Sequence, residues 1–508
     1  MTAAESDGAP AVRRSAGADA RPEVATLRRV LLLSAVPMAV VAILGAFRLG
    51  VRPFSLDETT SYYLTQIGWG RFLEVVLDSK VNMSLYFSLL RLWPFTGDEA
   101  GLRALSILFG ILTVPALIAL ARRLMPDLYA IAAAIVLAAT SLYLYELRDA
   151  RGYSLVVLLV VLGSWLLVVA AESRRPWAWI AWGATMGLSL FAHFFAAFIL
   201  LAHLAAVAWT RPSFPRGPAI VAGAVLVVMA VPIGLTVLLT GGTTLGWVQP
   251  TTWERLWASL VAFAGSGASL GIYAVGLALG LAALWRWPVG WEEHRPLAWR
   301  LVILSALLPV IMVALLSLLK PVLVDRYLIV ALPFVILAAV GALVATSERL
   351  GAASMAILLV ACAVTASNDL GASPSNPPPW AARVIDGARP GDGVVFAEPQ
   401  YRKVLAYYLP EDLAGALALA TSDVPIDANP YEPRRPTGVS FEEALDRMPC
   451  RHERVWMIGG ARNLERAEGS TLQQIVTALD DSYVETAVNR FGNRLVRLWE
   501  RDAGAGCR

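Results

Sequence analysis

The sequence predicts a polytopic α-helical membrane protein that ends in a separate α/β domain outside the bilayer. Of its 508 residues, 57% are hydrophobic and only 16% are charged, a balance that soluble domains rarely reach. Apolar runs of membrane-spanning length recur until a Pro-rich stretch, SPSNPPPW, at 373–380, after which the chain becomes more polar. The net charge of +3 and the lack of a basic stripe exclude nucleic acid as a partner.

Eleven apolar segments have the length of roughly 17 to 25 residues that a helix needs to cross a bilayer. The first has no A-x-A cleavage site, so we expect it to be retained. The polar residues before it, 1–27, are predicted to be disordered. Between the first two segments, a first outer loop (50–99) contains a shorter apolar piece, 83–95, which we expect to lie at the interface as a helix. The segments are 30–49, 100–121, 127–146, 152–171, 177–193, 194–210, 218–240, 265–286, 299–319, 326–346 and 350–367.

The arginines of alternate short loops predict the orientation in the membrane. With the N-terminus in the cytoplasm, the inner loops are rich in arginine, as the positive-inside rule requires. An odd number of spans then places the C-terminus outside, so we expect a multi-pass protein of the cytoplasmic membrane with an extracytoplasmic C-terminal domain. The inner arginines are Arg28, Arg29, Arg122, Arg123, Arg174, Arg175, Arg211, Arg216, Arg286, Arg295, Arg300 and Arg349.

The polar C-terminal region, 368–508, follows the predicted membrane domain, 28–367. Its segments GDGVVFAEP (391–399) and RVWMIGGA (454–461) are typical of buried strands. FEEALDRM (441–448) and TLQQIVTALDD (471–481) have helical periodicity, so a small α/β domain is predicted. Cys450 and Cys507 would both face an oxidising compartment, which permits a disulfide between them.

Two clusters of basic residues on the predicted outer side depart from the positive-inside pattern. They lie in YELRDARGY (145–153) and KPVLVDRY (320–327). Cations held against the outer bilayer surface indicate an anionic ligand, and a lipid-linked phosphate is the natural candidate. The alternative is that each side chain covers apolar surface and extends to the interface. That alternative is favoured for the isolated Arg52, Arg71 and Arg103, whereas the two clusters favour a function.

An acidic pair, Asp57 and Glu58, follows the first span in FSLDETTSYYLTQ (54–66). Ser55 and Glu58 have the S-x-x-E spacing of a capping box, in which the two residues satisfy each other's backbone N–H groups. Capping accounts for Glu58 but leaves the Asp57 side chain unused. Because adjacent helical residues point about 100° apart, one carboxylate can cap the helix while the other faces a cavity.

The cluster at 145–153 also carries acids. If it is helical, Glu146 and Asp149 form one i,i+3 pair and Arg148 and Arg151 another, which gives an acidic and a basic face. The alternative is a loop of surface ion pairs, worth only about 0–1 kcal/mol each. His193, in LFAHFFAAF, is a functional candidate because it lies inside an apolar segment, with a hydrogen bond between helices as the alternative.

Five segments in order along the chain resemble the GT-C superfamily of polytopic glycosyltransferases. The similarity is to its bacterial family-39-like branch, related to protein O-mannosyltransferases and aminoarabinose transferases, and it covers roughly residues 30–350. It does not extend to the C-terminal domain. The segments are LDETTSYYL (56–64), VNMSLYFSLLRLW (81–93), DEAGLRALSILFG (98–110), YELRDARGYSL (145–155) and DRYLIVALP (325–333).

The resemblance implies transfer of a sugar from a polyprenyl-phosphate donor to a hydroxyl of a glycan, lipid or protein acceptor at the outer face. It implies that Asp57 is the catalytic base and that Glu58 supports it. It further implies that basic residues hold the lipid phosphate, here Arg148, Arg151, Lys320 and Arg326. We add Tyr153 and Lys80 as candidates for the same role. Glu146, Asp149, Tyr86 and His193 are additional candidates.

The chain departs from these relatives at two places. Asn82-Met83-Ser84 stands where prolines are usual, and Arg151 lies in a loop where some members place a metal-binding carboxylate. The second departure leaves two alternatives for the reaction, one without a cofactor and one with a divalent metal.

The chemistry is consistent with the residue types. A polyprenyl phosphate leaves as an anion, which cations stabilise, and a carboxylate base contributes about 10²–10⁴-fold. Direct displacement by the acceptor hydroxyl inverts the anomeric centre and needs no second carboxylate as nucleophile. Two alternatives are a lipid-phosphate transporter or flippase, which predicts charges deep inside the spans, and a non-catalytic assembly protein, for which Asp57→Asn would be silent.

Overall fold

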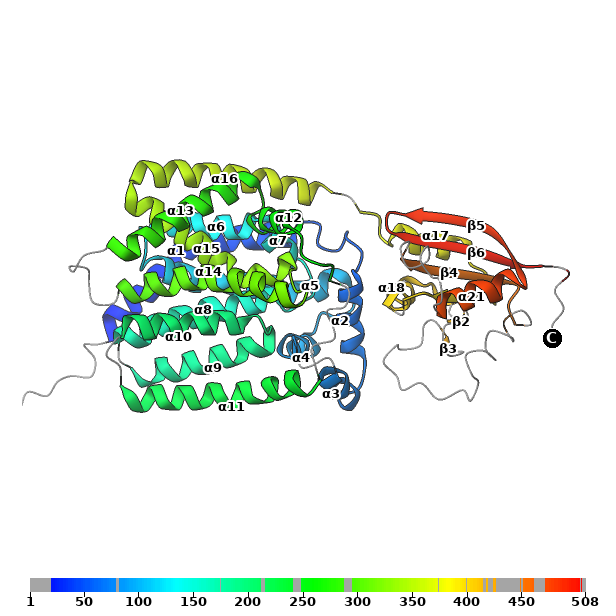
Figure 1. Cartoon of the computed structure of the whole chain (residues 1–508), viewed down its shortest axis with the longest axis horizontal. Helices are drawn as coiled ribbons and strands as arrows, with labels where there is room; N and C mark the ends of the chain where they lie inside the picture. The colour runs from blue at the N-terminus through cyan, green and yellow to red at the C-terminus, as the bar shows by residue number, and fades with distance from the viewer. Residues whose placement is uncertain are drawn as a thin grey trace, which may run out of the picture.

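In a computed structural model, the chain forms a bundle of long helices with a sheet domain beside one end of it (Figure 1). The structure describes residues 20–78, 82–173, 175–211, 215–240, 248–286, 295–372, 374–398, 400–413, 417–418, 424–425, 448, 451–460, 471–502 and 504. The two parts correspond to the membrane domain and the C-terminal domain that the sequence predicts.

Every predicted apolar segment contains a helix. The helices of the bundle are α1 (Ala20–Ala46), α5 (Glu99–Ala121), α6 (Asp127–Ala139), α7 (Ser141–Leu147), α8 (Tyr153–Ser173), α9 (Pro176–Ala192), α10 (Ala196–Thr210), α11 (Arg216–Thr240), α12 (Trp253–Ala264), α13 (Gly267–Arg286), α14 (Arg295–Leu319), the 3₁₀ helix η2 (Asp325–Val330), α15 (Leu332–Thr346) and α16 (Glu348–Gly371). Helix α1 begins at Ala20, within the segment that was predicted to be disordered. Residues 1–19 lie outside the described part.

The predicted count of eleven spans is not confirmed. Seven helices in the described part are long and apolar enough to cross a membrane, or eight if α6 and α7 count as one broken span. Helices α9, α10 and α15 have only 17, 15 and 15 residues. At 1.5 Å per residue they are shorter than the roughly 30 Å of a hydrocarbon core.

A 67° bend separates α6 from α7 within the predicted span 127–146. At the bend, Thr140 leaves the helical conformation, with ψ at 125°, and its Oγ1 donates to the Val136 carbonyl at 2.7 Å. Helix α7 ends at Leu147, and the chain turns back into α8 at Tyr153. Residues 148–152 therefore form an irregular turn rather than a helical continuation.

Three short helices lie at the end of the bundle that faces the sheet domain: α2 (Leu56–Gln66), α3 (Trp69–Asp78) and α4 (Ser84–Leu92). Figure 1 shows α2 running across the ends of the long helices, between the bundle and the sheet domain. Helix α4 is the short helix predicted at 83–95, and Phe87 and Leu90 on it are buried in the bundle core. These helices lie in the connection between α1 and α5.

The C-terminal domain contains a six-stranded sheet among its described residues, in the order β3-β2-β1-β4-β6-β5. Strand β1 pairs in parallel with β2 and β4, and the other neighbours are antiparallel. Every residue of β1 and β4 is buried, as expected for central strands. The elements are α17 (Pro379–Gly387), β1 (Gly393–Phe396), α18 (Gln400–Tyr408), η3 (Glu411–Leu413), β2 (Leu417–Ala418), β3 (Val424–Pro425), β4 (Arg454–Gly460), α21 (Thr471–Asp480), β5 (Tyr483–Phe491) and β6 (Arg494–Arg501).

The predicted strands at 391–399 and 454–461 and the predicted helix at 471–481 match β1, β4 and α21. Nearly all of the predicted helix at 441–448 lies outside the described residues, as do Cys450 and Cys507.

Candidate active site

The start of α2 is a capping box, as the S-x-x-E spacing indicates. Ser55 Oγ accepts from the Glu58 backbone N–H at 3.1 Å, and Glu58 Oε2 accepts from the Ser55 N–H at 3.0 Å. The box uses Glu58 and leaves the side chain of Asp57 to point elsewhere.

Glu58 is fully buried, where it forms a two-pronged ion pair with Arg103 of α5. Arg103 Nε lies 2.6 Å from Glu58 Oε1, and Arg103 Nη2 lies 2.9 Å from Oε2. Burial alone would raise the pKa of Glu58, but the hydrogen bond and charge of Arg103, with that of Arg52, lower it to about 2. Glu58 is therefore ionised and already occupied by protein partners.

The prediction that the Arg103 side chain extends to the membrane interface is wrong. Its side chain is completely buried, and it also donates to the backbone carbonyls of Leu49, Arg52 and Pro53. It thus holds the whole loop that leads into α2. Its position inside the predicted span 100–121 is the sequence signal that could have indicated this role, because a charge inside a span needs a partner.

Asp57 faces a different pair of arginines. Its Oδ2 lies 3.3 Å from Arg326 Nη1 and 3.9 Å from Arg151 Nη2, and its side chain is 39% exposed. Asp57 comes from α2, Arg151 from the turn between α7 and α8, and Arg326 from η2. Three segments far apart in the chain thus converge on one carboxylate.

Both arginines keep their charge beside Asp57. Burial tends to lower the pKa of Arg151 and of Arg326, but nearby acidic groups, Asp57 among them, raise both above the usual value. The Nε atom of Arg151 is buried and has no hydrogen-bond partner among the described residues. This guanidinium therefore retains hydrogen-bonding capacity for an anion.

An aromatic wall lies next to these arginines and contains two of the predicted residues, Tyr153 and His193. The His193 ring lies 5.4 Å from Tyr153, 5.5 Å from Tyr327 and 5.3 Å from Phe195, centroid to centroid. His193 is buried at the break between α9 and α10. Its Nδ1 accepts from the Phe195 N–H at 3.2 Å, so the neutral ring carries its proton on Nε2. No described residue accepts that proton.

The acids of the 145–153 cluster are buried, which contradicts a loop of exposed ion pairs. Asp149 accepts from Arg52 at 3.0 Å, and burial, followed by the charge of Glu58, raises the pKa of Asp149 well above its usual range. Glu146 is also buried, and its Oε2 has no hydrogen-bond partner within the described segments.

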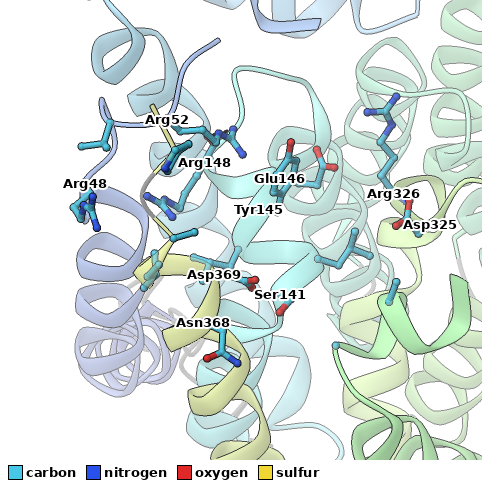
Figure 2. A pocket seen from close by; sticks show the side chains of 18 of the residues that line it. Arg48, Arg52, Ser141, Tyr145, Glu146, Arg148, Asp325, Arg326, Asn368 and Asp369 are labelled. Carbon is cyan, nitrogen blue, oxygen red and sulfur yellow. Dashed lines mark hydrogen bonds between the residues drawn. The ribbon is translucent and has the colours of Figure 1, made fainter. Parts of the chain in front are cut away.

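The helical pairing predicted for Arg148 and Arg151 is wrong, because α7 ends at Leu147. Arg148 turns away from Asp57 and donates to the Phe47 carbonyl at 2.6 Å. It lines a cavity of about 1070 Å³ that is bounded by α7, α12, η2 and the end of α16. Figure 2 shows Arg148 with Arg52 on one side of this cavity and Arg326 on the opposite side.

Arg326 connects the cavity to Asp57, since it lines the first and contacts the second. Four arginines and three acids line the cavity, together with apolar side chains. The charged lining residues are Arg48, Arg52, Arg148, Arg326, Glu146, Asp325 and Asp369.

Three further residues were predicted: Tyr86, Lys320 and Lys80. Tyr86 is buried, and its hydroxyl forms a 2.9 Å hydrogen bond with Ser106 of α5, which joins α4 to α5. Lys320 is exposed directly after α14. Lys80 lies outside the described residues.

The described residues do not form a recognisable metal site. No group of three His, Cys, Asp or Glu side chains gathers anywhere in the described ranges with a geometry that could hold an ion. Glu58 and Asp149 are engaged by arginines, and Asp57 lies between two more.

Known proteins resemble this chain in one sequence segment and in fold. Residues 84–235 match the family model described as dolichyl-phosphate-mannose-protein mannosyltransferase. Over nearly the whole chain the fold is similar to those of the solved ArnT and AglB structures, and these findings support the resemblance to the GT-C polytopic glycosyltransferases. No curated protein sequence matches it significantly.

Two solved structures illustrate the likeness. The chain is similar to ArnT from Cupriavidus metallidurans bound to undecaprenyl phosphate, with 13% identity and a TM-score of 0.55 over 94% of this chain and 99% of that one. It is also similar to the Archaeoglobus fulgidus oligosaccharyltransferase AglB in complex with an inhibitory peptide and a dolichol-phosphate. That likeness has 11% identity and a TM-score of 0.50, over 93% of this chain and 74% of that one.

Proposed function

We propose that this protein transfers a sugar from a polyprenyl-phosphate donor to a hydroxyl acceptor, with inversion, at the outer face of the cytoplasmic membrane. The reaction would serve the assembly of a cell-envelope glycan or glycoconjugate. The observation that carries the proposal is the convergence of Arg151 and Arg326 on Asp57, which brings a base and two phosphate-binding cations together. The lipid phosphates bound to ArnT and AglB support a donor of this class.

In the proposed reaction, the acceptor oxygen attacks the anomeric carbon while Asp57 takes the hydroxyl proton. The bond between the anomeric carbon and the phosphate oxygen breaks, and its electron pair leaves with the phosphate. Arg151 and Arg326 stabilise the negative charge that develops there, and the proton ends on the Asp57 carboxylate. Because the leaving group is already a stable anion, no general acid is needed.

We assign His193 and Tyr153 to the donor side of the site. The Nε2–H of His193 is a buried donor without a described partner, beside arginines that attract anions. A phosphate oxygen or a sugar hydroxyl would satisfy it. Arg148 lies across the cavity from Arg326, so we expect it to contribute less to the phosphate that reacts.

The test uses membranes that contain the protein and a panel of radiolabelled polyprenyl-phosphate sugars, with Asp57→Asn and Arg151→Ala as variants. Transfer by the wild type that both variants lose supports the proposal. Full transfer by both variants would overturn the site assignment. No transfer by the wild type would favour a lipid-phosphate transporter or an assembly protein. A reporter fused after Arg508 tests the orientation separately, and a cytoplasmic signal there would contradict the outer-face reaction.

A further inference from the structure

We propose that the C-terminal domain is a working part of the active site, because its helix α18 holds the start of α2 and thereby orients Asp57. This inference rests on the proposed function. It assigns Tyr408, with Tyr407 beside it, as a positioning residue that acts on Asp57 through the backbone. The proposal follows from the contacts on the two sides of α2.

Tyr408 ties the entry of α2 to the bundle. The backbone N–H of Phe54, three residues before Asp57, donates to the Tyr408 hydroxyl at 2.8 Å. That hydroxyl in turn donates to Glu99 Oε1, at the first residue of α5, at 2.9 Å. The Tyr408 hydroxyl therefore joins the C-terminal domain (called the outer domain below) to the loop before α2 and to the start of α5.

Tyr407 fills the space beside this hydrogen bond. Its ring lies 4.7 Å from the ring of Phe54 and 4.9 Å from that of Tyr62, both in edge-on arrangements. Its hydroxyl donates to the second oxygen of Glu99 at 3.2 Å. The aromatic packing restrains the position of α2 along its length, while Tyr408 restrains its start.

The outer domain and the active site contact different faces of α2. Leu56 packs on the core of the outer domain, and Thr60, one turn later, accepts from Lys403 Nζ of α18 at 3.3 Å. Asp57 and Ser61 form the neighbouring row, where Ser61 Oγ donates to the Ala150 carbonyl at 2.7 Å. A shift of α18 would therefore move the backbone that carries Asp57 without touching the arginines.

Such a shift would matter because proton transfer depends on distance. Asp57 must reach the acceptor hydroxyl while Arg326 stays 3.3 Å away, and a displacement of about 1 Å at a reacting group can cost on the order of 100-fold in rate. Arg103 restrains the loop before α2 from inside the bundle through three carbonyls. Tyr408 restrains the same loop from the C-terminal domain. We therefore expect both residues to be needed to fix the position of this loop.

The test compares Tyr408→Phe with Tyr401→Phe in the full-length protein. Tyr401 is on the same helix, but its ring packs on Trp380 inside the outer domain. We expect Tyr408→Phe to lower kcat by about tenfold to 100-fold with little change in the KM for the donor. Its melting temperature should stay near that of the wild type, and amide exchange should quicken in residues 54–60. Tyr401→Phe should behave as wild type.

If Tyr408 only attaches the C-terminal domain to the helix bundle, Tyr408→Phe should lower the melting temperature and leave kcat unchanged. Wild-type kcat in Tyr408→Phe, beside an inactive Asp57→Asn, would overturn this inference and spare the proposed function. An equal loss in Tyr401→Phe would also overturn it, because the effect would then come from general disturbance of the domain. Full activity of Asp57→Asn would overturn the proposed function and this inference with it.

Discussion

Arg326 places its guanidinium 3.3 Å from the carboxylate of Asp57, so in the reaction proposed above one cation would contact both the base and the leaving phosphate. The neighbouring carboxylate, Glu58, has a separate buried partner in Arg103. Two adjacent acids of one helix therefore have distinct environments. Asp57 can exchange its partner for a ligand, whereas Glu58 cannot do so without breaking the loop that leads into α2.

Asp57→Asn should abolish transfer while it preserves donor binding. Loss of the base should lower kcat by about 10²–10⁴-fold. Binding of the polyprenyl phosphate should stay equal or become tighter, because the amide competes less with phosphate for Arg151 and Arg326. Transfer assays and donor titration by thermal shift measure the two effects. Glu74→Gln, in an exposed ion pair with Arg71 on α3, is the matched control and should be silent.

Arg326→Ala should lower both kcat and donor affinity, and Arg326→Lys should recover only part of each. Lysine restores the charge but not the planar, two-pronged hydrogen bonding of a guanidinium. Arg71→Ala removes an arginine from the exposed pair on α3 and provides the control. If Arg326→Ala keeps wild-type transfer at saturating donor, Arg326 does not stabilise the leaving phosphate.

His193→Phe should raise the donor KM by about 10-fold to 100-fold, the loss expected when a charged acceptor loses one hydrogen bond. His193→Gln keeps a side-chain donor and should recover part of the affinity. His203→Gln changes the other buried histidine of this region, which bonds to Trp182 and Ser164. It should affect stability rather than the donor KM, and equal KM changes in both histidine variants would contradict the assignment of His193.

Glu58→Gln should destabilise the protein by roughly 3–5 kcal/mol, because it leaves the charge of Arg103 buried without its counter-ion. Glu172→Gln breaks a half-exposed pair with Arg123 and should cost at most about 1 kcal/mol. Thermal unfolding in detergent at neutral pH measures both. Equal melting temperatures for the two variants would show that the Glu58–Arg103 pair does not hold the loop.

The same pair predicts a pH dependence. The pKa of Glu58 falls from its usual 4.5 to about 2 on folding, so the ionised form stabilises the fold. That contribution is fully present above pH 4.5 and is lost as the pH falls toward 2. The difference in melting temperature between wild type and Glu58→Gln should therefore be constant from pH 8 to 5.5 and shrink below pH 4.5. A difference that shrinks already between pH 8 and 5.5 would contradict this origin.

Most helices of the bundle could be predicted from sequence, because the thickness of a bilayer sets the length of an apolar run. The break at Thr140 could not, since 127–146 is apolar on both sides of it and only tertiary packing selects the bend. The end of α7 at Leu147 was equally unpredictable, and it leaves Arg148 and Arg151 in a turn rather than on one helix. The helical spacing assumed for these two arginines therefore failed.

The sequence allowed us to predict which residues belong to the candidate site better than which of them contact each other. Asp57, Arg151 and Arg326 were each recognisable as charges at the ends of predicted spans. Their convergence depends on how η2 and the 148–152 turn pack, which no local pattern encodes. Arg103 was misjudged because its partner, Glu58, becomes apparent only when α5 and α2 are placed together. The contact of Tyr408 with Phe54 had no sequence signal at all.

The bond between Phe54 and Tyr408 spans 354 residues of chain, which has a consequence for biogenesis. Synthesis proceeds from the N-terminus, so the loop before α2 is complete long before the hydroxyl that fixes it has been made. The bundle can insert early, yet the loop before α2 lacks this hydrogen bond until the C-terminal domain has folded. A chain stalled or cut before residue 408 would resemble the mature protein within the bilayer but would not carry out transfer.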